Sequence, residues 1–568
     1  MKFDLLKAFY KRVIRYLHQQ GHSIYLRYYV RAKNWVIFLL RSPQMSRLYR
    51  IGQKRSPDAG TVLFWVTGGP PTTRIMEGAI AAALQLRGIP VHAVICDAPF
   101  TACGEHIVTQ NVPLEHWRDS CKRCGAEASA TLKHFRIPFS FIGDYVPESV
   151  RSELWEKTES VTWDTLDSLC YRDINLGKNA RSSVYRYLQG YELGCNEEVV
   201  RQYAFTALVM AAAASTAMDR ISPSRIFITD VASVDWGPAF RTAFSRKLPV
   251  TTWAESYLRC HFLYRHIEDE NSMHFHGMSQ NAWDKCNNGS VQPNELERLK
   301  KYLENRYEKR VGFNPEGLAG YDGDIPRLRE KYSLAPEKPV WGIMPHVNWD
   351  NVFDYSPMLY PTFDEWMIDT IRIISSISDV NWLIKIHPAE AWGNPESGVE
   401  RLIERHFPSL PDNVRVIPAK EILSPLEFYE LVDGGVTVYG TPGLELSLLG
   451  KPVILAGTSY YGGKGFTHDA SSIDEYRQLL GKAKSLELLS EEQRLLAQKY
   501  AYCLYIQRQV PLPVVKDPHS IKWTFQYGKR NLLLPGNDPF IDFVCERILD
   551  GKDFIMDERL VALSEKHE

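Results

Sequence analysis

The sequence lacks any apolar run of the roughly 18 residues that a membrane-spanning helix requires. Its most apolar stretches, 35–40 and 205–218, are too short or too rich in alanine, and the second is typical of a buried helix. The amino-terminal stretch has scattered charges and lacks the apolar core of a cleavable signal peptide. We therefore expect a cytoplasmic chain with neither a membrane span nor a leader.

Cysteine is too irregularly spaced to form a disulfide framework, with ten residues in 568. A chain of this size needs no such staples, so the thiols are expected to be reduced. Four cysteines share one stretch with the spacing C-x6-C-x17-C-x2-C and are the only candidates for a zinc or iron–sulfur site: Cys96, Cys103, Cys121 and Cys124. This spacing matches no established signature, and we predict free or structural thiols and no metal.

The chain has almost no net charge, −1 at pH 7, but that charge is unevenly distributed. Residues 1–55 contain thirteen lysines and arginines and a single acidic residue, Asp4. Apolar residues recur among them at helical spacing, which favours binding to an anionic surface on the inner face of the cell membrane. The alternative is a pair of helices packed on the body with a solvated basic face. No nucleic-acid motif accompanies the charge, so no nucleic acid partner is expected.

Internal repeats and low-complexity tracts are also absent, and 568 residues exceed the roughly 250–300 at which one core stops growing. Strand and helix patterns alternate twice, first from the run TVLFWVTGG at residue 61 and again from residue 339. This alternation predicts the α/β class, with two Rossmann-like doubly wound domains that face each other across a cleft. The predicted segments are 1–55, a basic amphipathic helical extension; 56–311, the first Rossmann-like domain; 312–337, a linker; 338–520, the second Rossmann-like domain; and 521–568, a helical tail.

The most informative stretch is 436–457, VTVYGTPGLELSLLGKPVILAG, which predicts a strand, a short helix and a second strand. Thr441 is the expected N-cap of the helix, with proline at the next position. Gly440 and Gly443 allow the backbone to approach a ligand closely, and the helix start offers N–H groups to an anion. Glu445 lies about one turn inside the helix, where it can reach sugar hydroxyls. The stretch therefore predicts a nucleotide-binding corner.

Two further segments reach the ligand-facing edge of the same predicted sheet. In WLIKIHPAE (382–390), Lys385 and His387 stand at a strand end, where a histidine can donate to a phosphate oxygen or stabilise a leaving phosphate. In PHVNWDNVFDY (345–355), loop side chains can stack on a base or bond to hydroxyls, and the binding candidates are Asn348, Trp349 and Asp350. The alternatives are a strand cap and side chains that stabilise the loop.

The loop TSYYGGKGFTHDA (458–470) is rich in glycine and follows the second strand of the nucleotide-binding corner. Its Lys464 and His468 suit a mobile lid or a contact to phosphate. A flexible surface loop is the alternative.

Together these segments resemble the carboxyl-terminal half of the capsule polysaccharide biosynthesis family, which comprises two-domain GT-B-type glycosyltransferases and includes bacterial β-Kdo transferases. The resemblance covers 340–470 and rests on the Asn-Trp-Asp loop, Lys-x-His-Pro-x-Glu, Gly-Thr-x-Gly-x-Glu with Gly-Lys-Pro-Val, and the Tyr/Gly-rich loop. It implies that His387 and Lys385 contact the phosphates of a nucleotide-sugar donor. It also implies an anion site at Thr441 and Gly443, and a ribose contact from Glu445. The domains at 56–311 and 338–520 would then bind acceptor and donor, respectively.

An inverting transferase also needs a general base that faces the acceptor hydroxyl, normally from the first domain. Carboxylates stand at predicted strand ends there, and the candidates are Asp97, Asp230, Asp235 and Glu255. Asp230 follows the strand RIFIT and Glu255 follows VTTWA, so these two, with His387, are the predicted catalytic residues. Each carboxylate can instead be a cap or a structural group.

We therefore predict a glycosyltransferase that moves a sugar from a nucleotide-activated donor to a surface polysaccharide or lipid-linked glycan of the capsule or lipopolysaccharide type. No Asp-x-Asp metal-binding motif stands out, so we expect no required metal or other cofactor. The alternatives are a polyol-phosphate transferase or sugar epimerase on the same fold, because fold does not determine chemistry. A third is a non-catalytic nucleotide- or carbohydrate-binding partner of an assembly complex.

Overall fold

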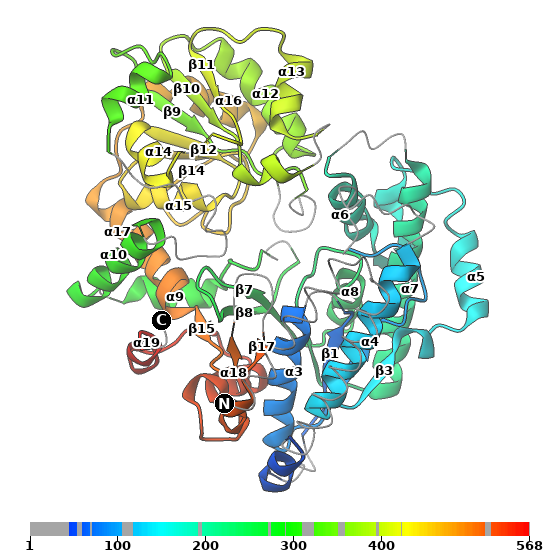
Figure 1. Ribbon diagram of the computed structural model, residues 1–568. Coiled ribbons are helices and arrows are strands. Elements are labelled where there is room, and N and C mark those ends of the chain that lie inside the picture. The colour runs from blue at the N-terminus through cyan, green and yellow to red at the C-terminus, as the bar shows by residue number, and fades with distance from the viewer. Residues whose placement is uncertain are drawn as a thin grey trace, which may run out of the picture.

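Two mainly parallel sheets form the centres of two lobes in the computed structural model (Figure 1). The residues described are 45–53, 59–68, 71–104, 117–190, 196–270, 274–289, 291–308, 323–349, 358–393, 397–421, 423–516 and 524–566. Most of the basic extension at 1–55, and Asp350, lie outside them. Within the described ranges, no helix is both long and apolar enough to cross a bilayer.

The first sheet has seven strands in the order β15-β8-β7-β6-β1-β2-β3. These are β15 (Val510–Pro511), β8 (His261–Ile267), β7 (Val250–Glu255), β6 (Arg225–Ile228), β1 (Val62–Val66), β2 (Val91–Ile95) and β3 (Phe139–Phe141). All five side chains of β1, VLFWV, are buried, as expected for a central parallel strand covered on both faces. Phe64 packs with α3 (Pro71–Leu86), whereas Trp65 packs with α7 (Glu197–Ile221).

The second sheet has six strands in the order β11-β10-β9-β12-β13-β14. These are β11 (Val414–Ile417), β10 (Asn381–Lys385), β9 (Val340–Ile343), β12 (Gly434–Thr437), β13 (Val453–Leu455) and β14 (His468–Asp469). In each sheet the strand that comes first in the sequence is an inner strand. Strand β1 lies between β2 and β6, and β9 lies between β10 and β12. This order confirms two Rossmann-like doubly wound domains and puts a ligand-binding switch point beside β1 and beside β9.

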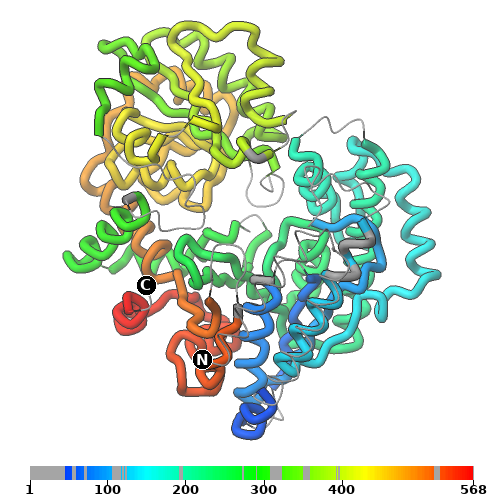
Figure 2. The backbone as a smooth tube through the Cα atoms, in the orientation of Figure 1, coloured from blue at the N-terminus to red at the C-terminus, as the bar shows by residue number. Residues whose placement is uncertain are grey.

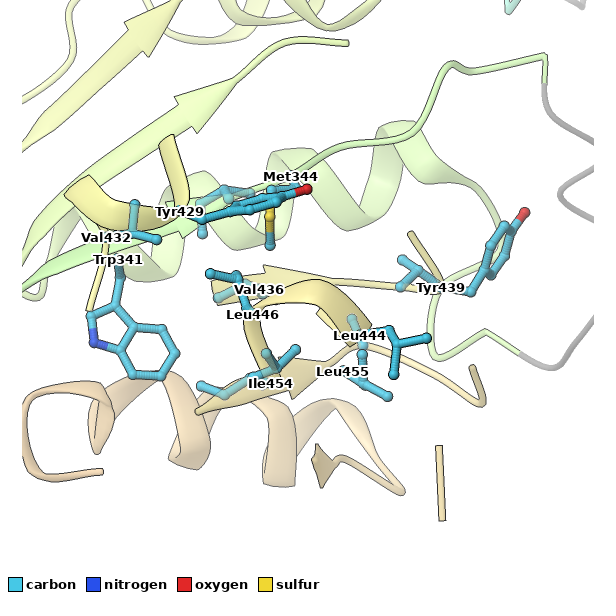
Figure 3. Packing of buried hydrophobic residues seen from close by; sticks show 14 of the residues in the cluster. Trp341, Met344, Tyr429, Val432, Val436, Tyr439, Leu444, Leu446, Ile454 and Leu455 are labelled. Atoms are coloured by element: carbon cyan, nitrogen blue, oxygen red, sulfur yellow. The ribbon is translucent and has the colours of Figure 1, made fainter. Parts of the chain in front are cut away.

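The predicted strand–helix–strand corner is present as β12, α15 (Thr441–Leu448) and β13. The N-cap is Gly440 rather than Thr441, and no side chain caps the helix. Gly450 follows the helix with φ of 77°, a left-handed conformation that favours glycine. Leu444 and Leu446 are fully buried and pack among strand residues and Tyr429 (Figure 3), each contributing roughly 2 kcal/mol of burial. Packing thus holds this corner rigidly.

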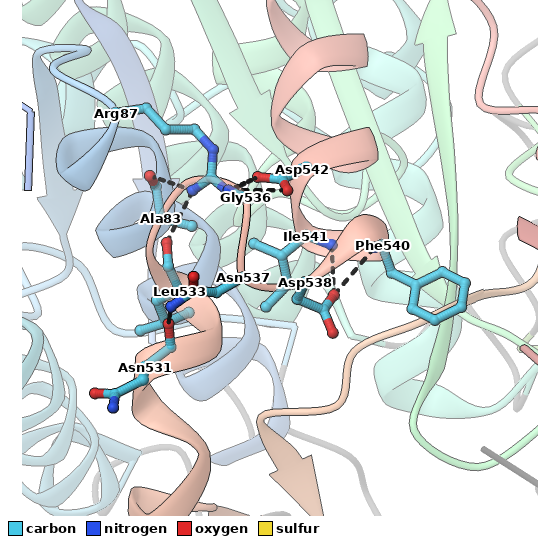
Figure 4. A network of polar contacts seen from close by, with 10 residues as sticks. All are labelled: Ala83, Arg87, Asn531, Leu533, Gly536, Asn537, Asp538, Phe540, Ile541 and Asp542. Carbon is cyan, nitrogen blue, oxygen red and sulfur yellow. Dashed lines mark hydrogen bonds and ion pairs between the residues drawn. The ribbon is translucent and has the colours of Figure 1, made fainter. Parts of the chain in front are cut away.

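The carboxyl-terminal part of the chain returns to the first lobe (Figure 2). After α17 (Glu491–Tyr502) a π-helical turn (Cys503–Gln507) leads into β15, which pairs antiparallel with β8. The predicted boundary at 520 therefore lies beyond this return. Arg87 of α3 donates to the carbonyl of Leu533 at 2.9 Å and pairs with Asp542 of α18 (Pro539–Asp550), which secures the last segment (Figure 4).

Candidate functional site

Three adjacent strand ends of the second sheet bring the main predicted site segments together. His346 follows β9, His387 follows β10, and Gly440 follows β12. A Cβ atom built at Gly440 would lie 3.5 Å from Cε1 of His346. Strands β10 and β12 are two strand spacings apart, about 10 Å. The ends of these strands, with His346 between them, stand at the switch point of the sheet, where ligands of doubly wound domains bind.

His387 is exposed, but protein surrounds it closely. This desolvation, together with the neighbouring Lys385 ammonium, lowers the pKa of His387 to about 4, so the imidazole is neutral at pH 7. Its Nδ1 accepts from the backbone N–H of Ala389 at 3.1 Å and caps the short 3-10 helix Pro388–Trp392. A neutral imidazole whose Nδ1 accepts carries its proton on Nε2. His387 thus presents one hydrogen-bond donor to a ligand and acts as a strand-end cap as well.

Lys385 lies beside His387 and is half-buried. Its Nζ donates to the carbonyl of Ile386 at 3.1 Å, and burial lowers the pKa of the ammonium against the opposing effect of Glu421. The structure therefore brings Lys385 and His387 together, as the Lys-x-His-Pro motif predicts. A cation next to a neutral donor is suited to an anionic ligand.

Sequence reasoning missed His346, although it stands in the quoted loop after β9. Its ring stacks on Phe363 at 4.7 Å, and its Nε2 accepts from the N–H of Tyr439 at 3.2 Å. Burial, and to a smaller degree His387, lowers the pKa of His346 to about 3. The signal that could have found it is position: the residue follows the first strand of a doubly wound domain.

The start of α15 offers fewer anion ligands than the sequence suggests. The N–H of Gly440 donates to Thr437 Oγ1 at 3.3 Å, the next helix position is proline, and the N–H of Gly443 donates to the carbonyl of Gly440 at 3.0 Å. Within the described part of the chain, the N–H of Thr441 has no acceptor. The Thr441 hydroxyl lies 3.5 Å from the hydroxyl of Tyr460. The N–H and the hydroxyl of Thr441 are therefore the groups at this helix start that can donate to an anion.

Gly443 serves packing rather than close approach of a ligand. A Cβ atom built there would lie 2.1 Å from the hydroxyl of Tyr461, which itself donates to the carbonyl of Gly440 at 2.7 Å. The space next to Gly443 is thus occupied by Tyr461, from the glycine-rich loop. The same tyrosine ring ties that loop to the helix start.

Replacing Gly443 with alanine is expected to lower the free energy of unfolding by about 1–3 kcal/mol, because the added methyl group overlaps the Tyr461 hydroxyl. Urea unfolding of the variant measures this loss. The double variant Gly443→Ala/Tyr461→Phe should recover part of it, since phenylalanine removes the overlapping oxygen. An undiminished stability of Gly443→Ala would contradict the packing role.

Glu445 is buried, with 4% of its side chain exposed, and already has partners. Its Oε2 accepts from the hydroxyl of Tyr429 at 2.7 Å, and its Oε1 lies 3.3 Å from Nε of Arg306. Arg306 belongs to α10 (Pro293–Glu308) and also lies over the ring of Tyr257 at 4.8 Å. Oε1 makes no hydrogen bond among the described contacts, so it is the oxygen left to accept from a ribose hydroxyl, as the resemblance implies.

Asn348 is buried at a contact between the lobes. Its Nδ2 donates to Asp364 at 2.7 Å, and the hydroxyl of Tyr185, from the first lobe, donates to the other oxygen of Asp364 at 2.9 Å. Burial raises the pKa of Asp364 to about 6 against the lowering effect of these two bonds. Among the described contacts, Oδ1 of Asn348 has no hydrogen-bond partner. Trp349, the next residue, packs its ring against Gly393.

Lys464 and His468 do not join the strand-end cluster. The Nζ of Lys464 donates to Gln280 of α9 (Gln280–Asn288) at 3.4 Å and lies 5.7 Å from the ring centre of Trp283. His468 stands in β14, two strands beyond β12 at the edge of the sheet. The glycine-rich loop reaches the site through Tyr460 and Tyr461 instead.

Two histidines of the first lobe, the buried His274 and the half-buried His276, contact this site and were also missed. His274 stacks on Tyr460 at 4.6 Å and meets Tyr439 at 5.4 Å, while His276 Nδ1 lies 2.9 Å from the hydroxyl of Tyr257. Burial, Arg265 and His346 lower the pKa of His274 to about 3. Aromatic and imidazole rings from both lobes thus pack in one cluster, which no local sequence pattern indicates.

Acidification below pH 6.5 is expected to penalise folding through His274. The folded ring stays neutral down to about pH 3, whereas the unfolded ring binds a proton below about 6.5. Stability is therefore complete above pH 6.5 and is lost as the pH falls, by about 1.4 kcal/mol for this ring at pH 5.5. The free energy of unfolding of wild type should therefore fall by that amount relative to that of His274→Phe between pH 7.5 and 5.5. An unchanged difference would contradict a neutral buried ring.

The first-lobe carboxylates all lie at the carboxyl edge of their sheet. Asp97 accepts from the N–H of Gly143 at 2.9 Å, and Asp235 accepts from the N–H of Gly104 at 2.6 Å, so both stabilise loops. Asp230 accepts from the N–H of Ala232 at 2.8 Å. It follows β6 and Glu255 ends β7, and these strands pair in parallel. The structure thus brings the two predicted bases to adjacent strand ends.

The cysteine stretch forms no metal site in the described ranges. Burial raises the pKa of the Cys96 thiol. Cys121, Asp235 and Cys124 raise it further by smaller amounts, so all three lie near Cys96. No group of three or more histidine, cysteine or acidic side chains is placed to hold a metal ion in the parts of the chain described. None of the four candidate cysteines forms a disulfide with another described residue.

Comparison with known proteins finds a family model that matches part of the chain. Residues 370–505 match the family model described as capsule polysaccharide biosynthesis protein. This confirms the resemblance over the segment that holds His387 and the 436–457 corner. No curated protein sequence matches the chain significantly.

Solved structures with similar folds include KpsC of Thermosulfurimonas dismutans. Its beta Kdo 2,4 transferase is 16% identical over 55% of this chain and 87% of that chain, with a TM-score of 0.34. Its beta Kdo 2,7 transferase is 14% identical over 50% and 79%, with a TM-score of 0.29. UDP-GlcNAc 2-epimerase from Neisseria meningitidis is 11% identical over 78% and 95%, with a TM-score of 0.25. At these TM-scores the likenesses carry no argument about activity.

Proposed function

Because residues 370–505 match the capsule polysaccharide biosynthesis family, we propose that this protein is a glycosyltransferase of capsule or lipopolysaccharide biosynthesis. It would move a sugar from a nucleotide-activated donor to a surface polysaccharide or lipid-linked glycan. The observation that supports the proposal is the position of these residues: Lys385 and His387 at the end of β10, His346 after β9 and Thr441 after β12, three neighbouring strands at the switch point of the second sheet. Two neutral hydrogen-bond donors, His387 Nε2–H and the N–H of Thr441, and the Lys385 ammonium suit the phosphates of a nucleotide sugar.

In the proposed reaction, the acceptor hydroxyl attacks the anomeric carbon directly while the bond from that carbon to the donor phosphate breaks. Asp230 or Glu255 takes the hydroxyl proton as general base. The electron pair of the breaking bond passes to the phosphate oxygen. Nε2–H of His387, the Lys385 ammonium and the N–H of Thr441 stabilise that developing charge.

Asn348 and Trp349 stand beside this phosphate site and are proposed to contact the rest of the donor. Oδ1 of Asn348, which has no partner among the described residues, can accept from a hydroxyl or a base N–H, and the Trp349 ring can stack. The Asp-x-Asp at 322–324 falls in the predicted linker 312–337 and not at a strand end, so we propose turnover without a divalent metal. A donor-dependent assay should then be unaffected by chelator, and complete loss of activity in chelator would contradict it.

The basic extension at 1–55 is proposed to hold the enzyme on the inner face of the cell membrane. Thirteen basic side chains favour vesicles that contain anionic lipid, and this attraction weakens as salt screens it. Cosedimentation with anionic vesicles at low and high salt tests the point. Equal binding to neutral vesicles would contradict an electrostatic contact.

A thermal-shift screen tests the donor site most simply. A ligand that binds only the folded state raises its stability, so at least one of CMP, UDP, GDP, CDP and their sugar conjugates should raise the Tm. Failure of all of them would overturn the donor site. Product analysis with the nucleotide sugar that binds then separates glycosyl transfer from polyol-phosphate transfer and from isomerisation of the donor. Turnover that persists in Asp230→Ala/Glu255→Ala would exclude these carboxylates as the base.

A further inference from the structure

A chain of hydrogen-bonded side chains crosses from the first lobe to the start of α15. Tyr257 lies two residues after Glu255, in the turn between β7 and β8, and its hydroxyl is 2.9 Å from Nδ1 of His276. The hydroxyls of Tyr257 and Tyr460 share a hydrogen bond, and the His276 ring lies close to both tyrosine rings, at 4.7 and 5.3 Å. Tyr460 in turn donates to the hydroxyl of Thr441 at 3.5 Å. Four side chains, two from each lobe, thus form one continuous chain that ends at Thr441.

The hydrogen bonds of this chain run in one direction. Because Tyr460 donates its one O–H to Thr441, its oxygen accepts the bond from Tyr257. Tyr257 uses its own O–H in that bond, so its oxygen accepts from Nδ1–H of His276. Burial, and to a smaller degree His274, lowers the pKa of His276 well below its ordinary value, so the ring is neutral at pH 7 and has one N–H to donate. The Thr441 hydroxyl therefore accepts a hydrogen bond from the protein and has its own O–H left to donate.

Packing holds the two tyrosines of this chain in place. The Arg306 guanidinium lies over the Tyr257 ring at 4.8 Å, and the Tyr505 ring packs edge-on against it with ring centres 5.1 Å apart. Tyr460 is 8% exposed, and His274 stacks on its ring at 4.6 Å. These contacts fix both rings, so the hydroxyl at the end of the chain is oriented before a ligand arrives. A donor that is oriented in advance stabilises an anion without reorganisation of the site.

We propose that Tyr257 is a positioning residue, which acts through Tyr460 to orient the Thr441 hydroxyl toward the phosphate of the nucleotide. The inference rests on the proposed function and adds a residue of the first lobe to the donor site in the second. Tyr257 acts without touching the nucleotide, because hydrogen bonds in a chain polarise one another. Its removal leaves the Thr441 hydroxyl free to rotate away from the phosphate. A merely structural chain would satisfy buried hydroxyl groups and have no effect on ligand binding.

Isothermal titration of the whole chain tests this role without turnover. The probes are CMP, UDP, GDP and CDP, each compared with its own nucleoside: cytidine, uridine or guanosine. Tyr257→Phe removes the central hydroxyl, and Tyr460→Phe breaks the chain at the next link, so one variant serves if the other does not fold. Thr441→Val removes the hydroxyl at the end of the chain. The matched control is Tyr264→Phe, which removes a buried hydroxyl of β8 that has no partner among the described residues.

We expect Tyr257→Phe and Tyr460→Phe to bind the nucleotide that wild type binds most tightly roughly fivefold more weakly, the size of one lost hydrogen bond. Tyr264→Phe should bind it as wild type does, and nucleoside affinity should be unchanged in each variant. Adding Tyr257→Phe to Thr441→Val should cause no further loss, because the group it orients is already absent.

Three results would overturn the positioning role while leaving the proposed function intact. The first is equal nucleotide affinity of Tyr257→Phe and wild type, and the second is an equal loss of nucleoside affinity. The third is a full further loss when Tyr257→Phe is added to Thr441→Val. Failure of all four nucleotides to bind wild type would overturn the proposed function, and this inference with it.

Discussion

Replacing Glu445 with alanine is expected to lower the free energy of unfolding by about 3–5 kcal/mol, because it leaves the Arg306 guanidinium in a buried position without its counter-charge. The carboxylate is 4% exposed and also accepts from Tyr429, so the variant loses a second buried bond. Arg306 lies on α10 and Glu445 on α15, so the pair links α10 to the nucleotide-binding corner. Urea unfolding monitored by circular dichroism gives the loss.

The matched control restores packing without charge. In Arg306→Met/Glu445→Leu, the buried pair is replaced by apolar side chains of similar volume, and such replacements are often neutral or stabilising. The double variant should therefore be clearly more stable than either Glu445→Ala or Arg306→Ala. A Glu445→Ala variant as stable as wild type would show that the pair is not formed in solution.

Replacing His387 with alanine is expected to lower kcat/KM for the nucleotide sugar roughly 100-fold, since it removes a donor aimed at the leaving phosphate. The ring is exposed, so the accompanying loss of stability should stay near the ~1 kcal/mol of a lost cap. Steady-state kinetics and a thermal melt measure the two effects. If the loss of kcat/KM, expressed as a free energy, were no larger than the loss of stability, His387 would act only as a cap.

Two controls separate the phosphate contact from the cap. Asparagine is a good N-cap, so His387→Asn keeps the bond to Ala389 but loses Nε2–H, and its kinetics should match those of His387→Ala. His468→Ala changes an imidazole at the sheet edge and should have little effect. Because the pKa of His387 is about 4, the loss should be the same from pH 6 to 8. A loss that disappears above pH 7 would instead indicate an imidazolium.

Local patterns in the sequence predict much of the second lobe. The run from 436 to 457 predicts strand, helix and strand because apolar runs, an early proline and a terminal glycine act on their neighbours. His387 was identified because proline ends its strand at a rim where ligands bind. The Rossmann-like order of both sheets follows from the same alternation of strand and helix.

What the sequence could not predict depends on residues far apart in the chain. Glycine at 443 suggests close approach of a ligand, but its space is occupied by Tyr461 from a later loop. Glu445 suggests a free carboxylate, but Arg306 reaches it from α10. The return of β15 to the first sheet likewise depends on long-range pairing that no local pattern encodes. Contacts of this kind arise from tertiary packing rather than from local propensity.

The central claim is that the phosphate of a nucleotide binds between His387 and Thr441. A crystal structure with the nucleotide that gives the largest thermal shift tests it directly. The account predicts a phosphate oxygen within hydrogen-bonding distance of Nε2 of His387 and another at the N–H of Thr441. A nucleotide whose phosphate binds away from the ends of β10 and β12 would contradict it.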